Sequence, residues 1–265
     1  MDIDARSGPQ SVEAREEELA RTKRELALVR AQLQRLQQRK SSLLAMAAHD
    51  LRTPLAIIQG YSQLLAVGLT DETDAATREY LTTIVGHSTV LGNTIENLVA
   101  LDQIERGEMG VSAVRCDLSE LVLAALAQVE GLARVKGLAV HCVTPPTPLW
   151  VFADENQVGR VLYNLLSHGE KYAREGGELS IEVMREGDYG CVKLIDPRRV
   201  LAADMIARIF DLIEVTPEGR ASVKGTDLGL VVARYVAEAH GGSVTVASSV
   251  ADGTCFTLCL PCSEA

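Results

Sequence analysis

One short polar run in this chain combines residue types that suit phosphoryl transfer: His49-Asp50-Leu51-Arg52-Thr53-Pro54. A neutral imidazole attacks phosphorus as a nucleophile, and a carboxylate beside it can fix its tautomer and raise its nucleophilicity. On a helix, His49, Arg52 and Thr53 share one face because they are spaced i, i+3 and i+4. The run interrupts an otherwise apolar segment, which favours a chemical role over a His that is only solvated or packed.

A helical hairpin is expected to carry this run. One helix continues through residues 41–55, where Pro54 removes a backbone hydrogen bond and should bend it. Residues 68–74 are predicted to form a turn, and a second helix is predicted over 74–105. The apolar stripe of the second helix consists of Leu81, Ile84, Val85, Leu91, Ile95, Leu98 and Val99. Because one hairpin has too little core alone, two are expected to pair as a four-helix bundle.

Residues 13–40 show the heptad pattern of a dimeric coiled coil. Leu19, Leu26 and Leu33 recur every seven residues, with charged residues on both sides. A second row, offset by three, contains Val29, Leu36 and Leu43. Thr22 and Lys40 interrupt the seam, so the coiled coil should be short. The alternative is a solvated single helix.

After residue 110 the pattern changes to mixed strands and helices. Strands are expected near 114–116, 138–143, 149–153, 178–185, 190–195, 243–248 and 254–260, and helices near 117–136, 154–168, 203–211 and 227–240. Asp117 and Asp154 suit the N-cap positions of two of these helices. The elements do not alternate regularly, so this half is predicted to be α+β, with helices on one face of a sheet.

The run from His49 to Leu55 closely resembles the phosphoacceptor box of bacterial two-component sensor histidine kinases. In that family the His is phosphorylated, the next acidic residue is its base partner, and a Thr four positions on assists dephosphorylation of the response regulator. The resemblance therefore implies these roles for His49, Asp50 and Thr53. Pro54 matches the helix-bending proline of the family.

Residues 164–172 resemble the N box of the ATP-binding domain in that family, a Bergerat-type fold shared with other GHKL ATPases. Asn164, Lys171 and Tyr172 match the box. His168 stands where a second Asn helps to hold magnesium in the family. Mg²⁺ prefers oxygen ligands, so an imidazole nitrogen is a poor substitute and no metal ligand is assigned. The alternative is that this helix only packs the domain.

The segment Asp196-Pro197-Arg198-Arg199-Val200 falls where the family has its G1 box, D-x-G-x-G. Asp196 matches the adenine-binding Asp. Arg198 and Val200 replace the two glycines, which let the backbone approach a ligand closely. These side chains are expected to crowd the adenine pocket. The alternatives are an arginine that reaches phosphate or ribose, and a plain Asp-Pro turn.

Residues 225–230, Gly-Thr-Asp-Leu-Gly-Leu, resemble the G2 box at the start of a helix. A Gly-rich loop at a helix N-terminus offers amide groups to phosphate. Gly225, Thr226 and Gly229 match, whereas Asp227 replaces the middle Gly and places a negative charge near the expected triphosphate. Asp227 is also a good helix cap, and that structural role is the stronger interpretation. Residues 206–211 resemble the F box of the family.

Composition narrows the class of protein further. The chain has 265 residues, a formal charge of -10 and 47% hydrophobic residues, which suits folded domains and argues against a nucleic-acid partner. We find no transmembrane run and no signal segment, so a cytoplasmic location is expected. Six cysteines are scattered along the chain, and Cys259-Leu260-Pro261-Cys262 is expected to pack or lie at the surface rather than bind zinc.

The predicted architecture is α plus α/β: a coiled coil (13–40) after a flexible N-terminus (1–12), a dimerisation and phosphotransfer domain (41–110), and a Bergerat-type GHKL α/β sandwich with a degenerate ATP site (111–265). The predicted function is two-component signalling in a cytoplasmic homodimer, with phosphoryl transfer at His49 to or from a response regulator receiver domain and impaired ATP binding. One alternative is an active ATP- and magnesium-dependent histidine kinase. Another is a non-catalytic scaffold without a cofactor that sequesters a response regulator or another histidine kinase.

Overall fold

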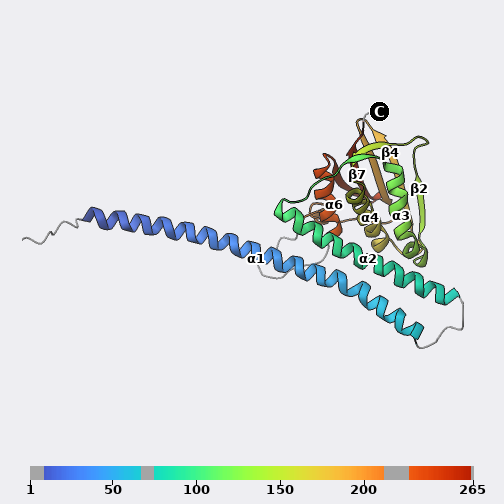
Figure 1. Ribbon diagram of the computed structural model, residues 1–265, viewed down its shortest axis with the longest axis horizontal. Helices are drawn as coiled ribbons and strands as arrows, with labels where there is room; N and C mark the ends of the chain where they lie inside the picture. The colour runs from blue at the N-terminus through green and yellow to red at the C-terminus, as the bar shows by residue number, and fades with distance from the viewer. Residues whose placement is uncertain (1–8, 67–74, 212–226, 264–265) are drawn as a thin grey trace, which may run out of the picture. The chain divides into compact units, whose positions relative to one another are not determined.

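Two long helices open the protein. The computed structural model describes residues 9–66, 75–211 and 227–263, and the side chains of most of them. Helix α1 is Pro9–Ala66 and helix α2 is Ala75–Arg106 (Figure 1). The Tyr61 and Tyr80 rings lie 5.2 Å apart between the two helices, which confirms the predicted hairpin. Residues 46–212 and 223–265 form one compact unit by their contacts, and the first 45 residues belong to another.

A mixed α/β part follows the hairpin. Its strands are β1 Val114–Asp117, β2 Ala139–Val143, β3 Trp150–Ala153, β4 Glu178–Glu186, β5 Tyr189–Asp196, β6 Ser243–Ser249 and β7 Gly253–Pro261. Its helices are α3 Leu118–Val135, α4 Glu155–Tyr172, α5 Ala203–Ile206 and α6 Leu228–Ala239. This order agrees with the α+β prediction, element by element.

The strands form two sheets. The larger sheet has the order β2-β4-β5-β7-β6, in which β2 and β4 are parallel and the other neighbours are antiparallel. The smaller sheet pairs β1 with β3 in antiparallel register. Helices α3, α4 and α6 pack together over one face of the larger sheet (Figure 1).

The core lies between these three helices and the sheet because their apolar faces meet there. Its fully buried side chains include Leu162, Ile181, Leu230 and Leu258. The helices begin at aspartates: Asp117, Asp154 and Asp227 each accept a hydrogen bond from a backbone N–H in the first turn. These N-caps confirm the structural role predicted for all three residues.

Two predicted helix ends were wrong. Helix α4 continues to Tyr172 rather than ending near His168, and Gly169 within it lies close to the sheet. A Cβ at Gly169 would lie 2.9 Å from the Leu194 side chain. Helix α5 is only Ala203–Ile206, and turns rather than helix follow it to Phe210.

A cross-strand disulfide was not predicted. Cys191 of β5 and Cys259 of β7 are directly opposite in register and form a disulfide of 2.07 Å. Their separation of 68 residues gave no indication of this pairing in the sequence. Among the described residues, no helix is both long and apolar enough to cross a membrane.

Gly253, the first residue of β7, has a backbone conformation and a close contact that only glycine allows. Its φ is +76°, and an added Cβ would lie 2.2 Å from the Asp196 carbonyl oxygen. We expect Gly253→Ala to lower the free energy of unfolding by about 3 kcal/mol or more, from backbone strain and overpacking together. Urea unfolding measures this loss.

Gly187→Ala is the matched control. Gly187 also has a positive φ, +62°, but its Cβ would meet nothing within 4 Å. Gly187→Ala should therefore lower the free energy of unfolding only by the backbone strain of a left-handed residue, about 1–2 kcal/mol. Equal losses in the two variants would contradict the packing argument.

Candidate functional site

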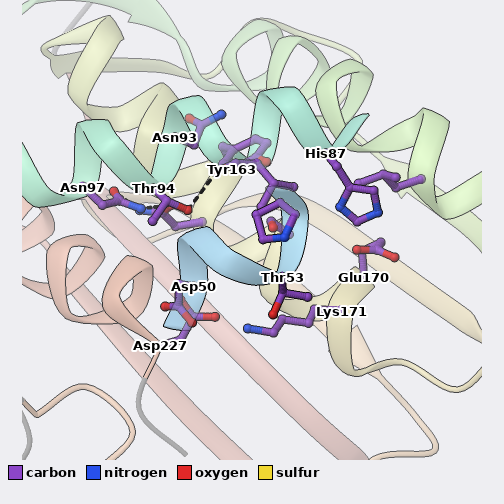
Figure 2. Close-up of a pocket in the computed structure, with 15 residues that line it drawn as sticks. Asp50, Thr53, His87, Asn93, Thr94, Asn97, Tyr163, Glu170, Lys171 and Asp227 are labelled. Carbon is purple, nitrogen blue, oxygen red and sulfur yellow. Dashed lines mark hydrogen bonds between the residues drawn. The ribbon is translucent and has the colours of Figure 1, made fainter. Parts of the chain in front are cut away.

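A cavity of about 180 Å³ lies where the hairpin meets α4 and the start of α6 (Figure 2). Its polar lining comprises Asp50 and Thr53 from α1, His87, Asn93, Thr94 and Asn97 from α2, Tyr163, Asn164, Ser167, Glu170 and Lys171 from α4, and Asp227. The structure therefore brings Asp50 and Thr53 of the predicted phosphoacceptor box together with residues of the predicted N and G2 boxes.

The phosphoacceptor box lies on α1. Asp50 and Thr53 line the cavity, and Pro54 is buried beside them. His49 belongs to the same helix, but its side chain lies outside the described part of the structure. Helix α1 continues through Pro54, so the bend predicted there stays a prediction.

The first Asn of the N box is held by two other elements. Asn164 and Asn97 of α2 exchange side-chain hydrogen bonds of 2.9 and 3.0 Å, and both residues are buried. The Asn164 amide also donates to the Gly229 carbonyl at 3.1 Å. Gly229 permits this contact, since a Cβ there would lie 2.8 Å from the Asn164 side chain. Both amide hydrogens of Asn164 are thus used within the protein.

His168, which replaces the second Asn, sits at the centre of a polar network that we call the 199–168–227 network. Its Nδ1 lies 3.1 Å from Asp227 Oδ2, and its Nε2 lies 3.1 Å from Arg199 Nη1. The ring is 2% exposed. The three members come from three different boxes of the predicted nucleotide site, and they now bond to one another.

The protonation of this network follows from its partners. Burial lowers the pKa of His168, so the ring is neutral near pH 7. A neutral ring has one donor and one acceptor nitrogen. Arg199 can only donate, so we assign the proton to Nδ1, where it donates to the Asp227 carboxylate. Burial raises the pKa of Asp227, but the His168 hydrogen bond, electrostatic attraction to the neighbouring groups and the Gly229 N–H together outweigh burial and lower it. Both ring nitrogens are therefore occupied.

Aromatic rings close the space around His168. Its ring centroid lies 4.6 Å from that of Tyr172 and 5.2 Å from that of Phe256. Phe256 in turn makes an edge contact with Phe210, at 6.2 Å. The Arg199 guanidinium stacks over Tyr172, 4.4 Å from the ring centroid. These rings and the Arg199 guanidinium thus pack against one another around His168.

The G1 segment differs from the prediction in which arginine turns inward. Arg198 and Val200, at the expected glycine positions, are exposed, so they do not crowd a pocket. Arg199, between them, enters the site instead. Asp196 is 7% exposed and its Oδ1 accepts from the Arg198 backbone N–H at 3.0 Å.

The G2 segment is described only in part. Gly225 and Thr226 lie outside the described residues. Gly229 is in the first turn of α6, where its N–H donates to Asp227 Oδ1 at 3.0 Å. Asp227 therefore caps the helix and holds His168 with its two oxygens.

Lys171 extends toward the acidic side of the cavity. Its amine points toward Asp50 and Asp227 (Figure 2). Burial opposes the charge on this amine, but attraction to Asp227, to the neighbouring Tyr172 and to Asp50 raises the pKa of Lys171. A cation is thus held between the phosphoacceptor box and α6.

Burial favours neutral side chains in the rest of the cavity. It raises the pKa of Tyr163 to about 12, raises the pKa of Glu170 and lowers the pKa of His87. Lys171 is therefore the charged group held beside the carboxylates, among neighbours whose neutral forms burial favours.

Sequence reasoning missed Asn97, Arg199 and Phe256. Asn97 had no usable signal, because helical spacing places it on the opposite side of α2 from the predicted apolar stripe. Arg199 had been considered only as a ligand for phosphate or ribose. Phe256 belongs to a strand whose inward positions are all apolar or small, which does not single it out.

The His168 pKa predicts how stability depends on pH. The folded value lies below the ordinary 6.5, so the unfolded chain binds more protons as pH falls below 6.5. The contribution of His168 is fully present above pH 6.5 and is lost on acidification, by at most about 1.4 kcal/mol per pH unit. The lowered pKa of Asp227 also makes the protein less stable on acidification, but only near and below pH 3.8, the ordinary pKa of an Asp side chain.

We expect His168→Gln to reduce the loss of stability between pH 7.5 and 5.5, because a Gln amide can donate to Asp227 and accept from Arg199 without titrating. Chemical unfolding at both pH values measures it, and exposed His141→Gln is the control. A residual dependence should come from His87, whose pKa is also lowered. An unchanged pH dependence in His168→Gln would refute the assignment.

Comparison with known proteins gives the family. The family model "His Kinase A (phospho-acceptor) domain" matches residues 39–107, and "Histidine kinase-, DNA gyrase B-, and HSP90-like ATPase" matches residues 153–264. The aerobic respiration control sensor protein ArcB of Escherichia coli (strain K12) is 31% identical over 231 residues, covering 85% of this chain. The chain spans only 29% of the length of that relative.

Solved structures share the fold. ShkA, solved in complex with AMPPNP, superposes with a TM-score of 0.56 at 21% identity, over 85% of this chain and 46% of its own. ThkA, solved in complex with the response regulator TrrA, superposes with a TM-score of 0.52 at 18% identity. The match covers 88% of this chain and 66% of the ThkA chain. With its hairpin, its α/β sandwich and both family domains in the expected order, this chain belongs to the two-component histidine-kinase family.

Proposed function

We propose that this chain is a phosphotransfer component of two-component signalling, in which His49 exchanges a phosphoryl group with a receiver aspartate and the ATPase-like domain binds Mg–ATP weakly or not at all. The 199–168–227 network is the observation that carries the second part. It joins three residues, each from a different nucleotide box, by hydrogen bonds of 3.1 Å.

The donor set suits magnesium poorly. Mg²⁺ requires near-octahedral oxygen ligands and gives up its waters reluctantly. His168 replaces an amide oxygen with a nitrogen, and both of its nitrogens are engaged. Asn164 is tied to Asn97 and Gly229. A metal would have to break these buried hydrogen bonds before it gained ligands.

The electrostatics disfavour a polyphosphate as well. Asp227 holds a carboxylate at the start of α6, where a helix would otherwise offer its positive end to an anion. Arg199 offers a compensating charge, but its guanidinium is committed to His168 and to the Tyr172 ring. Among the described residues, Arg199 and Lys171 are the cations that interact with this carboxylate or its partner, and both are already engaged within the protein, so a bound triphosphate would meet the negative charge of Asp227.

These costs act as one. A lost buried hydrogen bond costs about 1–3 kcal/mol, so the three departures could weaken binding by several powers of ten. Because the residues contact each other, their effects are not expected to add. Reverting one member would leave its partners unpaired, so only joint reversion should reopen the site.

The phosphoacceptor chemistry needs no nucleotide. The neutral imidazole of His49 attacks phosphorus of an aspartyl phosphate, the P–O bond to the carboxylate breaks, and that carboxylate leaves. We propose that Asp50 takes the proton released from the second ring nitrogen. In a separate phosphatase reaction, Thr53 is proposed to position the water that attacks the aspartyl phosphate of the receiver, so that the carboxylate leaves and inorganic phosphate is released. Lys171, held beside Asp50, can balance the added negative charge.

The proposed partners are a receiver domain and a second copy of the chain. The structure of ThkA with the response regulator TrrA supports the first. The exposed apolar side chains of the hairpin support the second, because a partner hairpin would cover them. They are Leu55, Leu64, Leu81, Val85, Ile95 and Val99. We propose the domain limits 13–40, 41–110 and 111–265 for the coiled coil, the phosphotransfer domain and the ATPase-like domain.

Nucleotide titration tests the ATP site. We expect the wild-type protein to bind ATP–Mg²⁺ with a Kd of about 1 mM or weaker by calorimetry. The joint variant His168→Asn, Arg199→Ser, Asp227→Gly should bind at least about tenfold more tightly, while each single variant should not.

Micromolar affinity in the wild-type protein would overturn the proposal in favour of an active kinase. A folded joint variant with no gain in affinity would show that the network is not what closes the site. Circular dichroism of each variant controls for folding.

Phosphoryl transfer tests His49. Incubation with a radiolabelled phospho-receiver domain should label the wild-type protein at an acid-labile site, and His49→Ala should remove the label. His141→Ala, which alters an exposed His of β2, should keep it. Label that persists in His49→Ala would make the assignment wrong.

A further inference from the structure

The small sheet presents the only Trp of the chain to solvent. The sequence has one Trp and three Phe. Trp150 is 38% exposed and Phe152 is 55% exposed, both on β3, whereas Phe256 is 3% exposed. Exposed Trp and Arg residues dominate the energy of protein interfaces, so two exposed aromatic rings in a chain this poor in them mark a surface of interest.

These rings share one face with a cation. Arg115 of β1 is directly opposite Phe152, and its guanidinium lies 4.6 Å from the Trp150 ring centroid. Residues of the opposite face, Cys116 and Val151, are buried in the domain. We call the outward side formed by Arg115, Trp150 and Phe152 the aromatic face.

The exposed charge of the aromatic face is positive. Asp117 is the remaining outward position, but its carboxylate turns to accept from the Ser119 and Leu149 backbone N–H groups, at 3.0 and 3.1 Å. The surface hollow beside Trp150 contains both Arg185 and Asp188, which balance each other. Arg115 is thus the exposed charge of the aromatic face, whereas the Asp117 carboxylate is engaged by backbone groups, and this cation favours an acidic partner.

The same sheet has an open edge. Its order is β1-β3, and the other side of β3 is bridged to the chain through Val151 and Cys262. Strand β1 is therefore the edge strand of this sheet in the described part of the chain. An extended peptide that adds to such an edge gains main-chain hydrogen bonds, and its alternate side chains read the adjoining face.

We propose that the aromatic face and the β1 edge bind an extended segment of a partner protein that carries acidic and large apolar side chains on one face. The segment adds antiparallel or parallel to β1, an acidic side chain pairs with Arg115, and apolar side chains cover Trp150 and Phe152. The surface is small, so the complex is transient. This interaction goes beyond phosphotransfer and does not depend on the ATP site.

Trp150 reports on this site directly, because no other Trp contributes to the fluorescence. The probe is the acetylated, amidated peptide Asp-Thr-Val-Thr-Asp-Thr-Val, which places acidic and apolar residues on one face of a strand. Its counterpart has Lys in place of each Asp. The acidic peptide should shift the emission saturably, with a Kd of about 10–500 µM, and the Lys peptide should bind at least about tenfold more weakly.

Variants separate the contributions of charge and ring. Arg115→Glu should reverse the preference between the two peptides, and Phe152→Ser should weaken the acidic peptide about tenfold. Tyr189→Ser is the matched control, because Tyr189 is an exposed aromatic residue on the larger sheet, 43% exposed. It should leave binding unchanged.

Three results would overturn the proposal. One is no emission change with the acidic peptide up to the millimolar range. Another is equal binding of both peptides, or no reversal in a folded Arg115→Glu variant. The third is a Trp150 emission shift that depends on protein concentration in the absence of peptide and disappears in Phe152→Ser. That result would show that the aromatic face is a contact between copies of the chain.

Discussion

The arrangement of the α/β domain depends on one buried imidazole with both nitrogens in use. His168 cannot stay in its apolar surroundings of Tyr172 and Phe256 unless each nitrogen has a partner, because a buried unsatisfied polar group costs about 1–3 kcal/mol. Asp227 supplies one partner at the start of α6, and Arg199 supplies the other after β5. The ring thereby ties the end of α4 to two loops.

This constraint changes how the departures from the family motifs are understood. Read along the chain, His168, Arg199 and Asp227 are three separate anomalies. In the structure they form one electrically balanced unit, in which a cation, a neutral ring and an anion follow one another. Removing one partner of a buried charged pair is strongly destabilising, so each change requires the others. If the ATPase-like domain does not bind a nucleotide, as we propose, these substitutions replace the ligand by side chains rather than remove a site step by step.

Much of the architecture could be predicted because it depends on local patterns. Periodicity located the hairpin and most strands, and aspartates located the helix starts. The sequence did not show that α4 continues through Gly169, where the lack of a side chain allows close contact with Leu194. The site was predicted residue by residue, yet its partners were not. His168 is 31 and 59 residues from its two partners, and no local rule relates such positions. Cys191 and Cys259 were missed for the same reason.

Helix α4 links this network to the hairpin. Asn164 bonds to Asn97 of the hairpin, and Lys171 lines the cavity beside the hairpin. His168, between them on the same helix, belongs to the 199–168–227 network. Asp227 borders both regions, because it bonds to His168 and also lines the cavity beside Asp50. If a nucleotide bound between these residues, the contacts between α4 and the hairpin would depend on the nucleotide concentration. If side chains hold these contacts instead, as we propose, the environment of the phosphoacceptor box is set by the sequence itself. Regulation must then act through the partners of the hairpin rather than through the occupancy of the ATPase-like domain.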